Sequence, residues 1–331
     1  MSLRGKRVLV TGGAGFIGSH LVDELILHAP ETVIVVDNFF LGKMENLAKA
    51  SNAFEGLRVY REDAGEYAAM ENIIGSERID VIFDLAVKPL PYSFTEPEGA
   101  YITSVRVAST LCSLLKKGFF RTLVHFSSSE AYGSAVEVPM NENHPLNPTT
   151  PYSAGKASAD LLIMSYCRTF DVDATVIRPF NTYGPRQNNQ TYAAVVPITI
   201  KRILAGQRPY VEWDGKQTRD FIFVKDLVHA AVESYLRKDR TRHRIVNVAG
   251  GKEVQVGWVI EMLARLMKYE GEIERRSKRA ADIARHYADI SLAKELLGFE
   301  PVTDMEHGLR ETVQWFSEHY PPSKIEHYMQ G

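Results

Sequence analysis

The chain has 331 residues, of which 45% are apolar and 24% are charged, and its formal net charge is -2. This composition is typical of a globular protein and excludes a disordered or fibrous chain, and the length allows two domains with buried cores. The balanced charge disfavours a nucleic-acid or anionic-membrane partner, because both normally bind a concentrated basic surface.

The cysteine content and the first residues of the chain bear on disulfides, metal sites and targeting signals. Two cysteines occur, Cys112 and Cys167, which allows neither a disulfide framework nor a zinc-binding spacing, so no metal site is expected. The first apolar segment, residues 8–10, is too short for a signal peptide or a membrane span. We therefore expect a cytoplasmic protein without a membrane anchor.

Short apolar runs rich in β-branched residues alternate with segments of helical period in the first half of the chain. Such runs predict strands covered on both faces, and the strand–helix alternation predicts an α/β fold with a doubly wound parallel sheet. The predicted strands are residues 7–11, 33–36, 57–60, 81–85, 123–127 and 175–178, and the predicted helices are residues 15–28, 66–74, 97–117 and 152–170.

The sequence pattern changes after residue 178, where prolines and glycines separate shorter segments of regular periodicity. Helical patterns recur at residues 194–205, 225–236 and 256–267. We interpret this part mainly as a smaller second domain, and the charged stretch 238–244 as an exposed turn.

A glycine-rich loop follows the first predicted strand and opens the first predicted helix. It contains the pattern G-x-G-x-x-G, and its glycines allow the backbone to approach a pyrophosphate at the positive end of the helix. A tight turn without a ligand is the structural alternative. The residues assigned here to dinucleotide binding are Gly12, Gly15, Phe16, Ile17 and Gly18.

Two carboxylates lie at the ends of the following strands. Asp37 has the spacing expected for a group that accepts the ribose hydroxyls, and it would repel a 2′-phosphate, so NAD is preferred over NADP. Asp63 is predicted to contact adenine, with a helix N-cap as an equally weighted alternative.

A catalytic group is predicted where the fifth strand ends and a later helix starts. Tyr152 and Lys156 share one helical face, and an ammonium beside the phenol is expected to lower the pKa of Tyr152 from about 10 towards neutrality, as a general base requires. Lys156 is also expected to reach the nicotinamide ribose, and Ser128 to hydrogen-bond the substrate oxygen that loses its proton. Taken singly, the tyrosine and lysine would be an ordinary surface pair.

With these motifs the chain resembles, over nearly its whole length, the extended short-chain dehydrogenase/reductases that act as nucleotide-sugar epimerases, dehydratases and decarboxylases. The resemblance also covers residues 178–187, 214–221 and 288–291. It implies an NAD-binding Rossmann domain of residues 1–178 and 224–250, and a smaller nucleotide-sugar-binding domain of residues 179–223 and 251–331.

The same resemblance implies further contacts. Asn181 and Arg219 would hold the diphosphate of a nucleotide-sugar substrate, and Arg186 and Arg285 would also contact the substrate. In this family, the helices predicted at residues 97–117 and 152–170 would form a homodimer interface.

Glu130 is the residue that best separates the activities within this family. Members that only epimerise C4 usually carry a small or hydroxyl residue there, whereas 4,6-dehydratases and glucuronate decarboxylases commonly carry glutamate, as in Ser128-Ser129-Glu130. In a dehydratase, oxidation of C4 acidifies the C5 proton, and Glu130 would remove it while C6 loses water. Ser129 departs from the dTDP-glucose dehydratases, which place an acid at that position.

Two segments, residues 90–94 and 178–187, look most similar to UDP-N-acetylglucosamine 4,6-dehydratases. Lys88 is a cation that would suit an anionic substrate, so epimerisation or decarboxylation of UDP-glucuronate remains an alternative. The leading prediction is therefore an NAD-dependent 4,6-dehydratase acting on a UDP-sugar, with a 4-epimerase and then a UDP-glucuronate decarboxylase as alternatives. A non-catalytic NAD-sensing regulator is disfavoured, because such proteins usually lose the Tyr-Lys pair that is present here.

Overall fold

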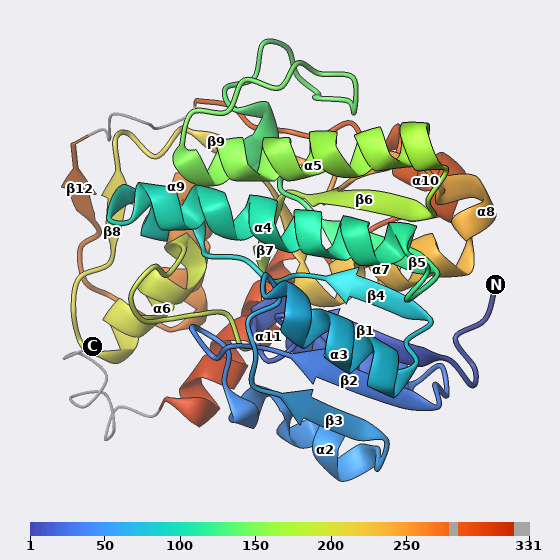
Figure 1. The fold of residues 1–331 in the computed structure, drawn as a ribbon. Coiled ribbons are helices and arrows are strands. Elements are labelled where there is room, and N and C mark those ends of the chain that lie inside the picture. Colours follow the sequence, from blue (N-terminus) through green and yellow to red (C-terminus); the bar gives the residue numbers. More distant parts are fainter. Residues whose placement is uncertain (278–283, 321–331) are drawn as a thin grey trace.

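A seven-stranded parallel sheet lies at the centre of the computed structural model, which describes residues 1–277 and 284–320 (Figure 1). The strand order is β10-β6-β5-β4-β1-β2-β3. The strands are β1 (Arg7–Thr11), β2 (Thr32–Val36), β3 (Leu57–Tyr60), β4 (Val81–Asp84), β5 (Thr122–Phe126), β6 (Ala174–Pro179) and β10 (Ile245–Val248). The direction of winding reverses between β1 and β4, which is where ligands bind in open sheets of this kind, beyond the carboxyl ends of the strands.

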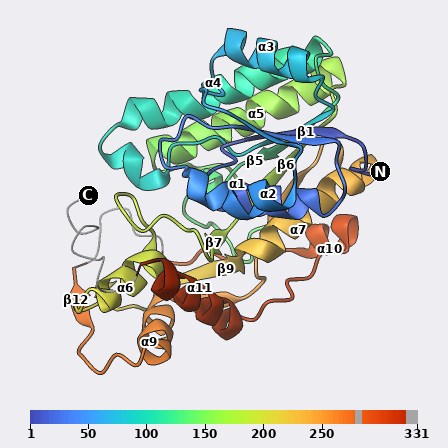
Figure 2. The same cartoon turned by 90° about the horizontal axis from the view of Figure 1, so that it is seen from below.

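Helices cover both faces of this sheet (Figure 2). The central strands are apolar on both sides because neither face meets water; every residue of β2 is buried, for example. One face carries α1 (Phe16–Ile26), α2 (Ala48–Ala53), α7 (Val224–Leu236) and α10 (Ser291–Leu297). The other carries α3 (Tyr67–Glu77), α4 (Pro97–Lys116) and α5 (Pro151–Phe170).

A second group of elements has its own apolar core, which includes Tyr183, Ile200, Phe223 and Leu263. Its sheets are β11-β9-β7 and β12-β8, from β7 (Asn181–Tyr183), β8 (Tyr210–Glu212), β9 (Thr218–Phe223), β11 (Glu253–Gln255) and β12 (Glu274–Arg276). Its helices are α6 (Val195–Leu204), α9 (Val256–Leu266) and α11 (Met305–His319). Short 3₁₀ helices occupy η1 (Met44–Leu47), η2 (Leu90–Phe94) and η3 (Ser129–Tyr132).

The α/β Rossmann fold is confirmed, and the six predicted strands lie within one residue of their expected ends. The chain returns to the main sheet through α7 and β10, which fall within the range 224–250 assigned to the first domain. Of the range 251–331 assigned to the second domain, residues 278–283 and 321–331 lie outside the described residues.

The prediction of an exposed turn at residues 238–244 is confirmed only in part: Asp239, Arg240, Arg242 and Arg244 are exposed and residues 242–243 form a turn, but the stretch begins as a helix. Residues Lys238–Thr241 form the short helix α8, Thr241 is fully buried, and the Lys238 ammonium lies 2.6 Å from the Asp173 carboxylate. Buried hydrogen bonds of Thr241 to the backbone of Ser234 and from Thr175 hold this helix against the sheet. Within the described residues, no helix combines the length and apolar character needed to cross a membrane.

Candidate functional site

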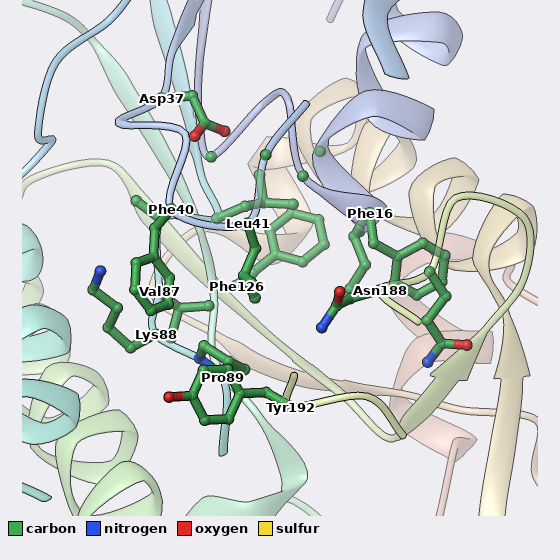
Figure 3. A pocket seen from close by; sticks show the side chains of 18 of the residues that line it. Phe16, Asp37, Phe40, Leu41, Val87, Lys88, Pro89, Phe126, Asn188 and Tyr192 are labelled. Atoms are coloured by element: carbon green, nitrogen blue, oxygen red, sulfur yellow. The ribbon is translucent and has the colours of Figure 1, made fainter. Parts of the chain in front are cut away.

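A cavity of about 420 Å³ lies at the carboxyl ends of β1, β2, β4 and β5 (Figure 3). Its wall joins the glycine loop, the segment after β4, the end of β5 and the start of α5. The predicted residues on this wall are Gly12, Gly15, Phe16, Ile17, Gly18, Asp37, Asp63, Lys88, Ser128, Tyr152, Lys156 and Arg186. Asn181, Glu130, Arg219 and Arg285 are not part of it.

The glycine loop needs glycine for steric reasons. Gly12 has a φ of +65°, and a Cβ there would lie 3.0 Å from the carbonyl carbon of Leu85. A Cβ on Gly18 would lie 2.2 Å from the Gly12 oxygen. Helix α1 starts after Gly15, and no side chain of the described residues caps that end, so its first amides suit an anionic phosphate group.

We expect Gly18→Ala to weaken NAD binding by about tenfold or more, because the added methyl forces the loop and helix apart. Calorimetric titration with NAD measures the effect, and thermal unfolding checks the fold. Gly75→Ala is the matched control, since a Cβ there meets nothing closer than 3.7 Å. Equal NAD affinity in the two variants would remove the glycine loop from the cofactor site.

The two predicted carboxylates on the cavity wall also bond to the protein. Asp37 accepts hydrogen bonds from the amides of Ala14, at 3.0 Å, and Phe39, at 2.8 Å, and burial raises its pKa above the usual range. Asp63 accepts from the Gly65 amide at 2.8 Å and pairs with Arg106 at 3.1 Å. Asp63 is not the N-cap of α3, a position that Glu66 occupies.

The start of α5 is fixed by a reciprocal cap. The Thr150 side chain accepts from the Ser153 amide at 3.2 Å, and the Ser153 hydroxyl accepts from the Thr150 amide at 2.8 Å. This cap sets Tyr152 in the first turn, where its phenol shares a hydrogen bond with the Ser128 hydroxyl at the end of β5. The predicted pairing of a helix start with a strand end is therefore present.

The electrostatics of Tyr152 differ from the expectation of a lowered pKa. In the protein alone, burial raises the pKa of Tyr152 to about 12; the Ser128 hydrogen bond opposes this rise, and the charges of Glu130 and Asp160 add to it. The Lys156 ammonium points to the sheet instead and donates to the Phe126 carbonyl at 2.7 Å. Helical spacing correctly placed the two residues on one face, but it did not show that the lysine bonds to the strand.

Glu130 lies in η3, just beyond Ser128, whose hydroxyl accepts from the Glu130 amide at 3.2 Å. Burial raises the pKa of this carboxyl, and the positive charge of Arg219 on β9 opposes the rise. The Glu130 charge also raises the pKa of Tyr152, so the two groups are close enough to interact electrostatically. Arg219 is thereby brought to the catalytic group, although it comes from the second group of elements.

Sequence reasoning missed a buried histidine beside these groups. His286 is fully buried, and burial together with the Arg219 charge lowers its pKa to about 4. Its ring lies 5.1 Å from that of Phe180. The position of His286, directly after the predicted substrate residue Arg285, could have marked it as a candidate. Its neighbours Phe180 and Arg219 are distant in sequence and meet it only in the folded chain.

Aromatic residues gather around Lys88 at one side of the cavity (Figure 3). The Lys88 ammonium lies 3.1 Å from the centre of the Phe40 ring and 5.6 Å from that of Tyr92, and Tyr192 stacks on Phe40 at 6.4 Å. Such cation–π contacts hold a partly buried ammonium. Phe40 and Tyr192 were not anticipated, because loop aromatics far apart in sequence carry no periodic signal.

The remaining predicted residues are dispersed. Arg186 lines the cavity but pairs with Asp23 of α1 at 2.7 Å, and Asn181 begins β7. Arg285 forms a two-point ion pair with Glu253 at 2.7 and 2.8 Å, and its side chain is 57% exposed. Arg285 is therefore a surface residue in this structure, and its ion pair joins it to Glu253 of β11.

Taken together, the cavity can hold a dinucleotide over the glycine loop and has the Tyr152 phenol and the Ser128 hydroxyl on its wall. The half-buried Glu130 carboxylate lies outside the wall but interacts with Tyr152 electrostatically. Hydroxyl oxidation needs a base for the hydroxyl proton and an acceptor for the hydride. A second carboxylate beside that base permits proton removal at a neighbouring carbon.

Comparison with known proteins places the chain among enzymes of related chemistry. A sequence model of the GDP-mannose 4,6 dehydratase family matches residues 9–312. UDP-glucuronic acid decarboxylase 6 of Arabidopsis thaliana is 34% identical over 312 residues, which are 92% of this chain and 86% of that protein.

Two solved structures are similar to almost the whole chain. UDP-glucose 4-epimerase of Thermotoga maritima, solved with UDP-glucose, has a TM-score of 0.88 and 32% identity, covering 95% of this chain and 99% of the other. The dTDP-glucose 4,6-dehydratase of Streptomyces venezuelae, solved with NAD, has a TM-score of 0.88 and 27% identity, covering 94% and 97%.

Proposed function

Because this chain belongs to the NAD-dependent nucleotide-sugar epimerase, dehydratase and decarboxylase family of the short-chain dehydrogenase/reductases, we propose that it is a 4,6-dehydratase acting on a UDP-sugar. The protein is an enzyme, and NAD is its cofactor. The observation that carries the choice of dehydratase is the Glu130 carboxylate, which lies close enough to Tyr152 to raise the pKa of the phenol.

In the first step, Tyr152 takes the proton of the C4 hydroxyl while the Ser128 hydroxyl holds the same oxygen. NAD supplies the chemistry of hydride transfer: it accepts hydride from C4 and gives it back to the same sugar. The positive charges of Lys156 and of the oxidised nicotinamide favour the phenolate form of Tyr152, against the raised pKa that burial gives this residue in the protein alone.

In the second step, Glu130 removes the proton from C5, which the C4 ketone has made acidic. The C6 hydroxyl then leaves as water with the proton that Glu130 removed. Hydride would return to C6, and Glu130, after taking a proton from solvent, would protonate C5. Burial raises the pKa of Glu130, which makes the carboxylate a stronger base than an exposed glutamate. The Arg219 charge opposes this rise and so favours the ionised form of Glu130.

The substrate contacts are part of the proposal. We assign the diphosphate to Asn181 and Arg219, with Arg186 and Arg285 as further substrate contacts, and Lys88 to the sugar or cofactor side of the cavity. Of these, Arg219 is supported by its position opposite Glu130. Arg285 must exchange its Glu253 partner for substrate to take this role. The division into an NAD-binding domain (1–178, 224–250) and a substrate domain (179–223, 251–331) follows from the same assignment.

A second candidate is a reaction on UDP-glucuronate, either decarboxylation or C4 epimerisation. The similarity to a UDP-glucuronic acid decarboxylase and the Lys88 cation at the cavity favour it. A uronate has a carboxylate at C6 and no hydroxyl to eliminate, so the two candidates differ in substrate and in product mass. Incubation with UDP-N-acetylglucosamine and with UDP-glucuronate, followed by NMR of the products, distinguishes them.

Turnover is expected to proceed without net formation of NADH, because the hydride taken from C4 returns to the same sugar. Absorbance at the NADH wavelength should rise briefly after substrate is added and then stay constant while product accumulates. A steady rise through many turnovers would contradict the dehydratase and epimerase mechanisms. It would indicate release of a 4-keto product after decarboxylation, or a simple dehydrogenase.

We also propose a homodimer formed by α4 and α5. Four large hydrophobic side chains on these helices are exposed: Tyr101 (39%), Ile102 (43%), Leu161 (58%) and Phe170 (43%). We expect sedimentation equilibrium to give twice the mass of one chain, and Leu161→Glu to lower it towards one chain. A single-chain mass for the unaltered protein would contradict the dimer.

A further inference from the structure

Three neighbouring strands of the main sheet end in a row of polar residues. Thr11 of β1 is the direct cross-strand partner of Asp84 of β4, and Asp84 is the partner of His125 of β5. The residues two positions earlier, Leu9, Ile82 and Leu123, belong to the core under α4 and α5. Because side chains alternate along a strand, the polar row lies on that same face.

The row holds a buried carboxylate between two donors. The Thr11 hydroxyl donates to Asp84 at 2.5 Å, and His125 Nδ1 donates to the other oxygen at 2.7 Å. Asp84 is 1% exposed and His125 2%. Burial alone raises the pKa of Asp84, but the bond and charge of His125, the Thr11 bond and the Lys156 charge outweigh it and hold the pKa below its usual range.

Lys156 lies on α5 above this row. Its side chain is buried, and its ammonium donates to the carbonyl of Phe126, the residue that follows His125. Burial lowers the pKa of Lys156, and the charges of Asp84 and Asp160 oppose the change. A lysine buried without compensation can lose its proton near neutral pH.

Asp84 and Asp160 are not equivalent as counter-charges. Asp160 pairs with the buried guanidinium of Arg178 at 2.8 Å. Among the described residues, no Arg or Lys lies within ion-pair distance of Asp84, which bonds only to neutral or titratable donors. Asp84 therefore supplies a negative charge that is not paired with an Arg or Lys among the described residues.

From this geometry we propose that Asp84, held by Thr11 and His125, is a positioning residue that keeps Lys156 protonated beneath the catalytic Tyr152. The role assigned to Lys156 rests on the proposed function. The charged groups that act on Lys156 are Asp84 from β4 and Asp160 from α5, and His125 and Arg178 are their respective partners. Tyr152 lies one helical turn before Lys156 on α5. A neutral Lys156 would no longer favour the phenolate, so the Asp84 charge extends the pH range of the reaction on its alkaline side.

The titration of Lys156 itself tests the proposal. Protein with bound NAD, labelled with ¹³C at lysine Cε, is titrated by NMR, and Lys156→Arg identifies the signal. In the unaltered protein we expect Lys156 to stay protonated at the pH of maximal turnover, and in Asp84→Asn a midpoint lower by about one pH unit or more. Asp80→Asn is the matched control, because Asp80 lies just before the other end of β4 and bonds to Lys6; it should leave the Lys156 midpoint unchanged.

Either of two results would overturn the inference. One is a Lys156 midpoint in folded, NAD-bound Asp84→Asn that equals that of Asp80→Asn. The other is a Lys156 that is already neutral at the pH of maximal turnover in the unaltered protein, a measurement that does not depend on the variant folding. Both are distinct from failure of the proposed function, which appears as undiminished turnover in Tyr152→Phe whatever the lysine titration shows.

Discussion

Replacement of Tyr152 with phenylalanine is expected to lower turnover by about 10²–10⁴-fold while NAD remains bound. The change removes one hydroxyl, which is the group that takes the C4 proton and bonds to Ser128. The aromatic ring stays and fills the same buried space, so the helix start and its Thr150 cap are preserved. Stopped-flow absorbance after addition of substrate should show that reduction of bound NAD slows by the same factor as turnover.

Tyr166→Phe is the matched control for this substitution. Tyr166 is on the same helix, but its ring packs against Phe170 at 5.1 Å, away from the cavity. We expect this variant to keep normal turnover. If Tyr152→Phe kept near-normal activity as well, the catalytic assignment at the start of α5 would have to be abandoned.

Replacement of Glu130 with glutamine is expected to separate the first step from the second. Glutamine keeps the shape and hydrogen bonding but cannot take a proton, so bound NAD should still be reduced on addition of UDP-N-acetylglucosamine. Elimination of water should slow by about 10²–10⁴-fold, the usual contribution of a positioned base. Glu137→Gln, at an exposed glutamate beyond η3, is the matched control and should dehydrate normally.

The expected pH dependence of dehydration follows from the ionisation of Glu130. Burial raises the pKa of Glu130, so its base form is present above that raised value and is lost as the pH falls through it. The rate of dehydration should therefore decrease on the acid side, at a pH above the usual range for glutamate. A rate that stays constant through this range in the unaltered enzyme would argue against Glu130 as the base.

Much of the first domain was predictable because its signals are local. Continuous apolar runs identify β1 to β6, and the glycine loop identifies the junction of β1 and α1, since each signal lies within a few consecutive residues. Strands β7 and β9 were missed. They form part of a small sheet whose members come from residues 181–183, 218–223 and 253–255, and such short segments carry little periodicity.

The sequence predicted which residues make up much of the candidate site, but it did not predict their hydrogen bonds or pKa shifts. Sequence spacing placed Tyr152 and Lys156 on one helical face, and the structure shows this. It did not predict that Lys156 bonds to the Phe126 carbonyl, or that Glu130 raises the pKa of Tyr152, because both depend on where the helix meets the end of β5. Asp84 and His125 also escaped notice, since their pairing follows from strand register.

Product mass after turnover in D₂O tests the central claim most directly. The purified enzyme is incubated with UDP-N-acetylglucosamine in D₂O, and the product is examined by mass spectrometry and NMR. As a dehydratase, it should yield a product lighter by one water molecule, with one solvent deuteron bound to carbon at C5. The original C5 proton leaves with the water, and Glu130 takes up a deuteron from solvent before it protonates C5. An isomer of unchanged mass without deuterium at carbon would contradict the account and establish C4 epimerisation, which does not involve C5.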